Sequence, residues 1–136
     1  MKNIFFAVLL VFSFSISAQT NPKTESFKIK QTTCIKKKGT QLVLKKVLSD
    51  SRCPQGVTCI WAGEATVLIS VYKDGKLIED KTIVLSSKKE EENKLWFTGN
   101  LPSDKQNLKE ISLIPYPEKE VKIATKDYYI NIGYLK

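Results

Sequence analysis

The sequence contains no histidine. Hydrolases that activate a serine or cysteine nucleophile through an imidazole are therefore excluded. The three cysteines cannot complete a four-ligand zinc site by themselves. A D-x-D-x-D-G calcium loop and a C-x-x-C redox pair are also missing. These absences predict a protein that is not an enzyme, with no catalytic residue, no metal site and no cofactor.

Long hydrophobic runs are scarce as well. The chain has one, Ile4–Phe14, which is too short to span a membrane. Lys2 precedes it and the small residue Ala18 follows it, as in a secretory signal peptide. We therefore expect residues 1–18 to be a signal peptide that is cleaved after Ala18. The mature protein would have no membrane span and would reside in the periplasm, the cell envelope or outside the cell.

Arginine is rare, since Arg52 is the only one among 22 basic residues. Cleavage would remove Lys2 alone among the charges and leave 21 basic against 14 acidic residues, a net charge of +7. This charge fits a solvated lysine surface, and it also fits attraction to anionic glycans or lipid headgroups. Nucleic acid is disfavoured as a partner because the protein is expected to be exported. Residues 19–24 are expected to be a flexible leader and residues 25–136 a single domain.

Short alternating segments dominate the mature chain. Ala65–Tyr72 and Asp127–Leu135 alternate apolar and polar residues as half-buried strands do. Asp74-Gly75 is a strong hairpin signal, and Gln41–Leu48 keeps its alternation only with a bulge at Lys45-Lys46. The pattern predicts an all-β fold of about seven or eight short strands. We expect an antiparallel β-sandwich, immunoglobulin-like in general architecture, with a small β-barrel as the alternative.

Four segments are harder to interpret. Thr82–Leu85 is either a separate strand or the continuation of the preceding strand beyond a bulge. Ser86–Lys94 is polar and predicts an exposed connection. Leu95–Phe97 is expected to be a short aromatic strand, and Val121–Ile123 a further short strand. No convincing amphipathic helix is apparent.

The segment Asp50–Ala65 combines two of the cysteines with the single arginine and one of the two tryptophans. Pro54 and Gly56 favour a turn between Cys53 and Cys59, so the two sulfurs can meet in a disulfide. Cys34 would then remain free. Pairing of Cys34 with either of the other two would need a tertiary contact that the sequence does not show.

Three residues of this segment are candidate binding residues: Arg52, Trp61 and Glu64. Trp61 is either a core residue that covers the disulfide or an exposed platform for a ligand such as a sugar ring. Arg52 either forms a structural ion pair with Asp50 or Glu64 or recognises an anion. Gly63 is expected to permit a bulge or tight bend before the next strand.

The motif Asp50–Pro54 followed by Cys59–Ala65 resembles a family of small exported bacterial proteins. These proteins combine a DSRCP-type segment with a C-x-W-A-G-x-A segment. Leu113–Pro117 also fits the pattern, so that the resemblance covers about residues 25–135. It implies one β-domain and brings no catalytic residue with it.

These observations favour an exported, non-enzymatic binding or structural module of the bacterial cell envelope. Its partner would be an envelope protein or an anionic glycan. The alternative is an enzyme inhibitor, or a small enzyme, acting through the Cys53–Cys59 loop. A cleft around Asp50, Arg52 and Glu64 would favour an enzyme, whereas a protruding rigid loop would favour an inhibitor. A flat or convex surface with exposed aromatic residues would favour binding.

Overall fold

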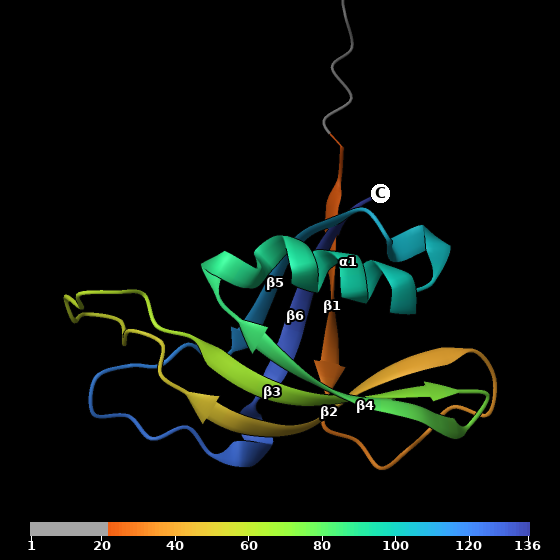
Figure 1. Ribbon diagram of the computed structural model, residues 1–136, viewed down its shortest axis with the longest axis horizontal. Helices are drawn as coiled ribbons and strands as arrows, with labels where there is room; N and C mark the ends of the chain where they lie inside the picture. Colours follow the sequence, from red (N-terminus) through yellow and green to blue (C-terminus); the bar gives the residue numbers. More distant parts are fainter. Residues whose placement is uncertain (1–21) are drawn as a thin grey trace, which may run out of the picture.

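A computed structural model describes residues 22–136, which form two antiparallel three-stranded sheets and one helix (Figure 1). The predicted signal peptide, residues 1–18, lies outside the described residues. Residues 22–136 confirm the all-β, sandwich-like prediction, with six strands among them in place of seven or eight. One sheet has the order β1–β6–β5 and the other the order β2–β3–β4. The elements are β1 (Thr24–Lys30), β2 (Thr40–Asp50), β3 (Ala65–Lys73), β4 (Lys76–Leu85), α1 (Glu90–Asn100), β5 (Leu108–Ile114) and β6 (Tyr129–Leu135), with 3₁₀ turns at Ser87–Lys89, Ser103–Lys105 and Thr125–Asp127.

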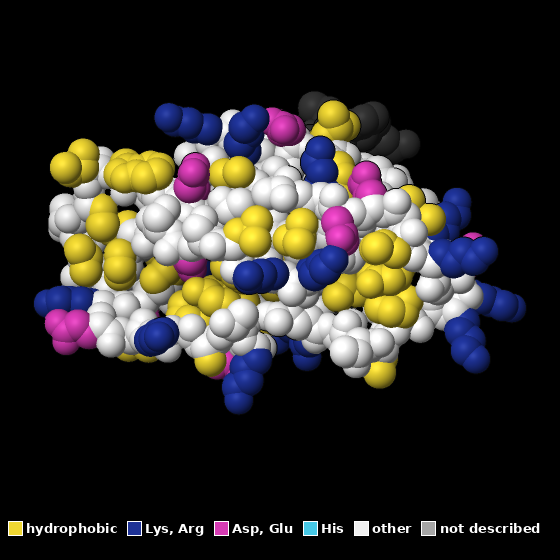
Figure 2. Space-filling model, turned by 60° about the horizontal axis from the view of Figure 1, so that its bottom comes forward, with side chains coloured by type: hydrophobic (Ala, Val, Ile, Leu, Met, Phe, Trp, Pro, Cys, Tyr) yellow, Lys and Arg dark blue, Asp and Glu magenta, His cyan; other side chains and the backbone are white. Residues whose placement is uncertain are grey.

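The two ends of the long axis differ in character. At the left of Figure 1 the loop that joins β2 to β3 projects beside the loop that joins β5 to β6. At the right lie the β3–β4 turn and the loop before β2. In Figure 2 the right-hand end carries several projecting Lys or Arg side chains, and the left-hand end shows more hydrophobic ones. The sandwich therefore presents two distinct loop regions to solvent.

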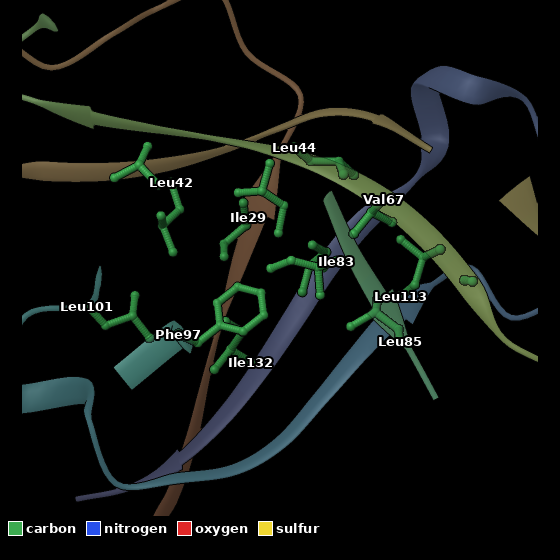
Figure 3. Packing of buried hydrophobic residues seen from close by; sticks show 14 residues of the cluster. Ile29, Leu42, Leu44, Val67, Ile83, Leu85, Phe97, Leu101, Leu113 and Ile132 are labelled. Atoms are coloured by element: carbon green, nitrogen blue, oxygen red, sulfur yellow. The ribbon is translucent and has the colours of Figure 1, made fainter. Parts of the chain in front are cut away.

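The hydrophobic core lies between the two sheets. Strands bury every second side chain there because successive side chains point to opposite faces. Figure 3 shows the aliphatic residues of both sheets closing around Phe97 of α1. The fully buried members of the core are Leu44, Ala65, Val67, Ile69, Phe97, Ile130 and Ile132.

The β2–β3–β4 sheet contains the predicted irregularities. The β2–β3 register shifts between Leu44 and Lys46, which confirms the bulge at Lys45-Lys46. Asp74 and Gly75 have φ of 51° and 80° and form the predicted tight turn. The β3–β4 register shifts at Tyr72, and β4 then continues unbroken to Leu85. The segment Thr82–Leu85 therefore continues β4 and is not a separate strand.

The expectation of an aromatic strand at Leu95–Phe97 is wrong, because these residues belong to α1. The connection expected at Ser86–Lys94 also turns helical, with three glutamates in the first turn, where the helix dipole favours negative charge. Lys94 Nζ lies 2.7 Å from Glu90 Oε1, one helical turn away. Phe97 is completely buried, and α1 contacts both β4 and β5. The helix thus closes the side of the sandwich between these two edge strands.

Two smaller expectations also change. Val121–Ile123 forms no strand and lies in the long β5–β6 loop. β1 begins at Thr24, the last residue of the expected leader. Among residues 22–136, no helix is long and apolar enough to cross a membrane.

Candidate binding site

The base of the β2–β3 loop is held by a buried ion pair. Arg52 Nε donates to Asp50 Oδ1 at 2.8 Å and Arg52 Nη2 donates to Asp50 Oδ2 at 2.7 Å. The two side chains are only 10% and 9% exposed. Of the two interpretations of Arg52, the structural ion pair with Asp50 is the one that forms. A bidentate pair of this kind fixes both position and orientation of the guanidinium.

The same guanidinium ties the loop to the other sheet. Arg52 Nη2 donates to the Pro115 carbonyl oxygen at 2.9 Å, and Nη1 donates to the Leu113 carbonyl oxygen. The guanidinium carbon lies 4.8 Å from the centre of the Tyr116 ring, a cation–π contact. Arg52 therefore connects the end of β2 to the end of β5 and to the segment that follows it.

The electrostatics of Asp50 reflect this network. Burial alone would raise the pKa of the Asp50 carboxyl, but the hydrogen bonds and charge of Arg52 outweigh it and hold the pKa below its ordinary value. The Tyr128 hydroxyl also donates to Asp50 Oδ2, at 3.1 Å. Burial, and then the hydrogen bond to Asp50, raise the pKa of Tyr128. The carboxylate is thus kept ionised by its neighbours and serves as an acceptor.

This lowered pKa makes stability depend on pH in the acid range. A carboxyl with a lower pKa in the folded state stabilises the fold fully above its unfolded-state pKa of about 3.9. That contribution disappears as the pH falls through the lower folded-state pKa. We expect Asp50→Asn to be less stable than the unaltered protein at pH ~7, with the difference shrinking below pH ~4. Urea unfolding from neutral to acid pH measures it, and a difference that stays constant would contradict the assignment.

A disulfide closes the loop beyond this base. Cys53 and Cys59 are bonded, with their Cα atoms 5.9 Å apart, as predicted, and Cys34 is free and exposed. The Cys53 amide donates to the Ala62 carbonyl oxygen at 2.8 Å. The Gln55 amide donates to the Pro117 carbonyl oxygen at 2.9 Å, which joins the loop to the β5–β6 loop. The β2–β3 loop is therefore held at its base by the Arg52–Asp50 pair, across its middle by the disulfide and to the β5–β6 loop by the hydrogen bond from Gln55 to Pro117.

Gly63 makes the bend into β3, as expected. Its φ is +74°, and a Cβ atom there would collide with the backbone carbonyl oxygen of Ser51. We expect Gly63→Ala to destabilise the fold by more than about 1 kcal/mol, the cost of positive φ alone. Gly56, with φ of +78° and no heavy atom within 4 Å of such a Cβ, is the matched control. Denaturant unfolding should show the larger loss at Gly63, and equal losses would mean that the close approach costs nothing.

The tip of the loop is apolar and exposed. The interpretation of Trp61 as a core residue is wrong, because its side chain is 60% exposed, and Ile60 beside it is fully exposed. Val57 is exposed too. We call Val57, Ile60 and Trp61 the loop tip. Val121 and Tyr116 of the neighbouring loop are also exposed, so apolar side chains gather at this end of the molecule.

The exposure of Trp61 predicts that its substitution costs less stability than loss of the disulfide. Trp61→Ala removes few packed contacts, so we expect a change in unfolding free energy below about 0.5 kcal/mol. Replacing Cys53 and Cys59 together by serine frees a short closed loop and should cost about 2 kcal/mol. Urea unfolding without reductant compares the two variants. A loss on Trp61→Ala that matches the loss of the disulfide would return Trp61 to a structural role.

The candidate residues do not converge on a catalytic cleft. Glu64 is half-buried, and its backbone carbonyl, not its carboxylate, accepts from the Ser51 amide at 2.8 Å. Among residues 22–136, Arg52 forms an ion pair with Asp50 but not with Glu64. Arg52 also lines a pocket of about 260 Å³ that opens between β5 and the start of α1. Asn93 lines the same pocket, but its amide already donates to the Val84 carbonyl oxygen at 2.8 Å.

Sequence reasoning missed Ile60 and Tyr116 as exposed residues of this end. The exposure of Ile60 could have been predicted, because Ile60 lies between Cys59 and Trp61 in a turn-rich loop that lacks the apolar–polar alternation of a half-buried strand.

In the part of the chain that the structure describes, no three Cys, Asp or Glu residues gather as metal ligands would. Comparison with models of protein families, with curated proteins and with solved structures finds no match to this chain.

Proposed function

We propose that this protein is an exported, non-enzymatic binding module of the bacterial cell envelope that contacts a partner protein through its loop tip. One observation carries the proposal: Ile60 and Trp61, consecutive in the sequence, are both exposed on a loop closed by a disulfide. Tryptophan is among the residues that contribute most to protein interfaces, because its large ring buries much apolar area on contact. The resemblance of the surrounding motif to a family of exported proteins stays a prediction.

The anchoring of the loop supports a binding role. A loop that is already ordered loses little conformational entropy when a partner binds, so more of the contact energy appears as affinity. The disulfide, the Arg52–Asp50 pair and the link from Gln55 to Pro117 supply that order. The loop projects from the sandwich (Figure 1), whereas small-molecule sites are concave. A macromolecular partner with a complementary depression fits this shape better than a sugar or a metabolite does.

A photoreactive residue placed at Ile60 tests the proposal in the living host. We expect ultraviolet light to give one discrete cross-linked protein, and Trp61→Ala in the same chain to abolish the adduct. The matched control carries the photoreactive residue at Leu95, which is 76% exposed on α1, far from the loop in sequence. Failure to obtain an adduct at Ile60, or the same adducts from both positions, would contradict the proposal.

The second candidate function is enzyme inhibition, favoured by the same disulfide-closed protruding loop. Inhibitory loops of this kind enter a protease cleft and resist cleavage because they are rigid. Incubation with serine, cysteine and metalloproteases would show reversible inhibition that is lost when Cys53 and Cys59 are both replaced by serine. Rapid cleavage between the two cysteines without inhibition would exclude this role.

A further inference from the structure

The end of the sandwich opposite the loop tip is formed by two lysine-bearing segments. Lys36–Lys38 lie in the loop before β2, and Lys73 and Lys76 flank the β3–β4 turn. Hydrogen bonds hold the two segments together. The Gly39 amide donates to Asp74 Oδ1 at 2.8 Å, and the Asp74 amide donates to the Gly39 carbonyl oxygen at 3.0 Å. We call Lys36, Lys37, Lys38, Lys73 and Lys76 the lysine tip; it lies at the right of Figures 1 and 2.

The lysine tip carries unbalanced charge. All five lysines are exposed, and none belongs to an ion pair formed by residues 22–136. Other lysines do find carboxylates, as Lys45 does with Asp80 at 2.6 Å. The one acid inside the tip, Asp74, accepts a hydrogen bond from the Gly39 amide and offsets one of the five positive charges. The remaining four like charges are fixed within two adjoining turns and repel one another, and an anionic partner would relieve this repulsion.

Exposed aliphatic residues adjoin these charges. Leu77 and Ile78, directly after Lys76, are 50% and 60% exposed. The register shift of β4 falls in the same place, where Glu79 pairs with Val71 and Leu77 with Tyr72, so Ile78 is the extra residue of a bulge. A hydrated polysaccharide would give aliphatic side chains no apolar environment. A lipid surface offers phosphate groups to the lysines and acyl chains to the aliphatic residues at once.

We propose that the lysine tip, together with Leu77 and Ile78, docks the protein onto an anionic phospholipid surface. This attachment is peripheral: the ammonium groups contact lipid phosphates and the two aliphatic side chains enter the boundary between headgroups and acyl chains. Because the two tips occupy opposite ends of the long axis (Figure 1), docking would point the loop tip away from the membrane. The inference goes beyond the proposed function and does not depend on the partner of the loop tip.

Vesicle binding by the predicted mature chain, Gln19–Lys136, tests this docking, because that chain contains every helix and strand of the described fold. We expect salt-sensitive binding to vesicles of phosphatidylcholine with phosphatidylglycerol and none to phosphatidylcholine alone. Each lysine near an anionic surface is worth about fivefold in affinity, so Lys36→Gln, Lys37→Gln and Lys38→Gln combined should weaken binding about a hundredfold. The matched control makes the same change in net charge in the segment between β5 and β6, in Lys119, Lys122 and Lys126, and should bind as the unaltered chain does.

A second variant separates a lipid surface from a soluble polyanion. Leu77→Ser with Ile78→Ser keeps the charge, and we expect it to weaken vesicle binding severalfold while leaving binding to dextran sulfate unchanged. Thermal unfolding of each variant verifies that the fold is retained. No binding to anionic vesicles, or equal losses in the two triple-lysine variants, would overturn the proposal. Vesicle binding that is indifferent to Leu77 and Ile78 would also overturn it and assign the tip to an anionic polysaccharide.

Discussion

Arg52→Ala is expected to lower the unfolding free energy by about 3–5 kcal/mol, because it leaves the buried Asp50 carboxylate without its counter-charge. The Asp50 side chain is only 9% exposed, so water replaces little of what is lost. The variant also removes donors from the Leu113 and Pro115 carbonyl oxygens. Equilibrium urea unfolding at neutral pH, with the disulfide intact, measures the loss.

Lys45→Ala is the matched control for this prediction. Lys45 and Asp80 are 2.6 Å apart, but their side chains are 52% and 32% exposed, and an exposed pair is worth at most about 1 kcal/mol. A double variant, Arg52→Ala with Asp50→Ala, should lose less than the sum of the two single variants, because the second substitution removes the unpaired charge. If Arg52→Ala cost no more than Lys45→Ala, the buried pair would not be what holds the loop base.

The Arg52–Asp50 pair also affects the proposed binding role, because it helps to orient the β2–β3 loop. Arg52 joins the last residue of β2, Asp50, to Leu113 near the end of β5 and to Pro115 just beyond it, so it helps to hold the angle at which the β2–β3 loop leaves the sandwich. The disulfide then stiffens the loop internally without fixing that angle. A variant at Arg52 that still folds should therefore present Ile60 and Trp61 in altered orientation, whereas Gly56→Ala, within the disulfide-closed segment, should leave the loop base in place.

Much of the β-structure could be predicted because its signals are local. Ala65–Tyr72 alternates over eight residues, and the turn at Asp74-Gly75 uses two residues that tolerate positive φ. Both appear in the structure where they were expected. The disulfide could be predicted for the same reason, since Pro54 and Gly56 bend a short segment between its cysteines. In each case neighbours in the sequence decide the structure.

The helix could not be predicted because its buried face is weakly marked. That face consists of Asn93 and Phe97, one turn apart, and a polar asparagine in the sequence does not predict a buried position. The aromatic residues Trp96 and Phe97 instead favour a strand by their propensity. Asn93 tolerates burial only because its amide donates to the Val84 carbonyl oxygen of β4. Tertiary contact, not local preference, makes this segment a helix.

The site was partly predictable for a related reason. An ion pair between Asp50 and Arg52 joins side chains two residues apart, and the sequence offers both. The other acceptors of Arg52 are backbone carbonyl oxygens of Leu113 and Pro115, more than sixty residues away, and no side-chain pattern reveals them. The exposure of Trp61 depends on the direction in which the loop leaves the sheet, and contacts with residues distant in the sequence, those of Arg52 and the hydrogen bond from Gln55 to Pro117, help to hold the loop in that direction.

Phe97→Ala is expected to cause the other large loss of stability, about 3–5 kcal/mol, because it leaves a cavity where α1 meets both sheets. The Phe97 side chain is completely buried within the core cluster (Figure 3). Its ring also makes an edge contact with the Trp96 ring, with the ring centres 5.0 Å apart. Urea unfolding measures the loss, and an unchanged m-value would show that the variant still unfolds in one cooperative step.

Leu95→Ala is the control that distinguishes a helix from a strand in this segment. A strand would place Leu95 and Phe97 on the same face, so both substitutions would be costly. In a helix two residues so spaced point in nearly opposite directions, and Leu95 is 76% exposed. We therefore expect Leu95→Ala to change the unfolding free energy by less than about 0.5 kcal/mol. Similar losses for the two variants would contradict the helix and restore the aromatic strand that the sequence favours.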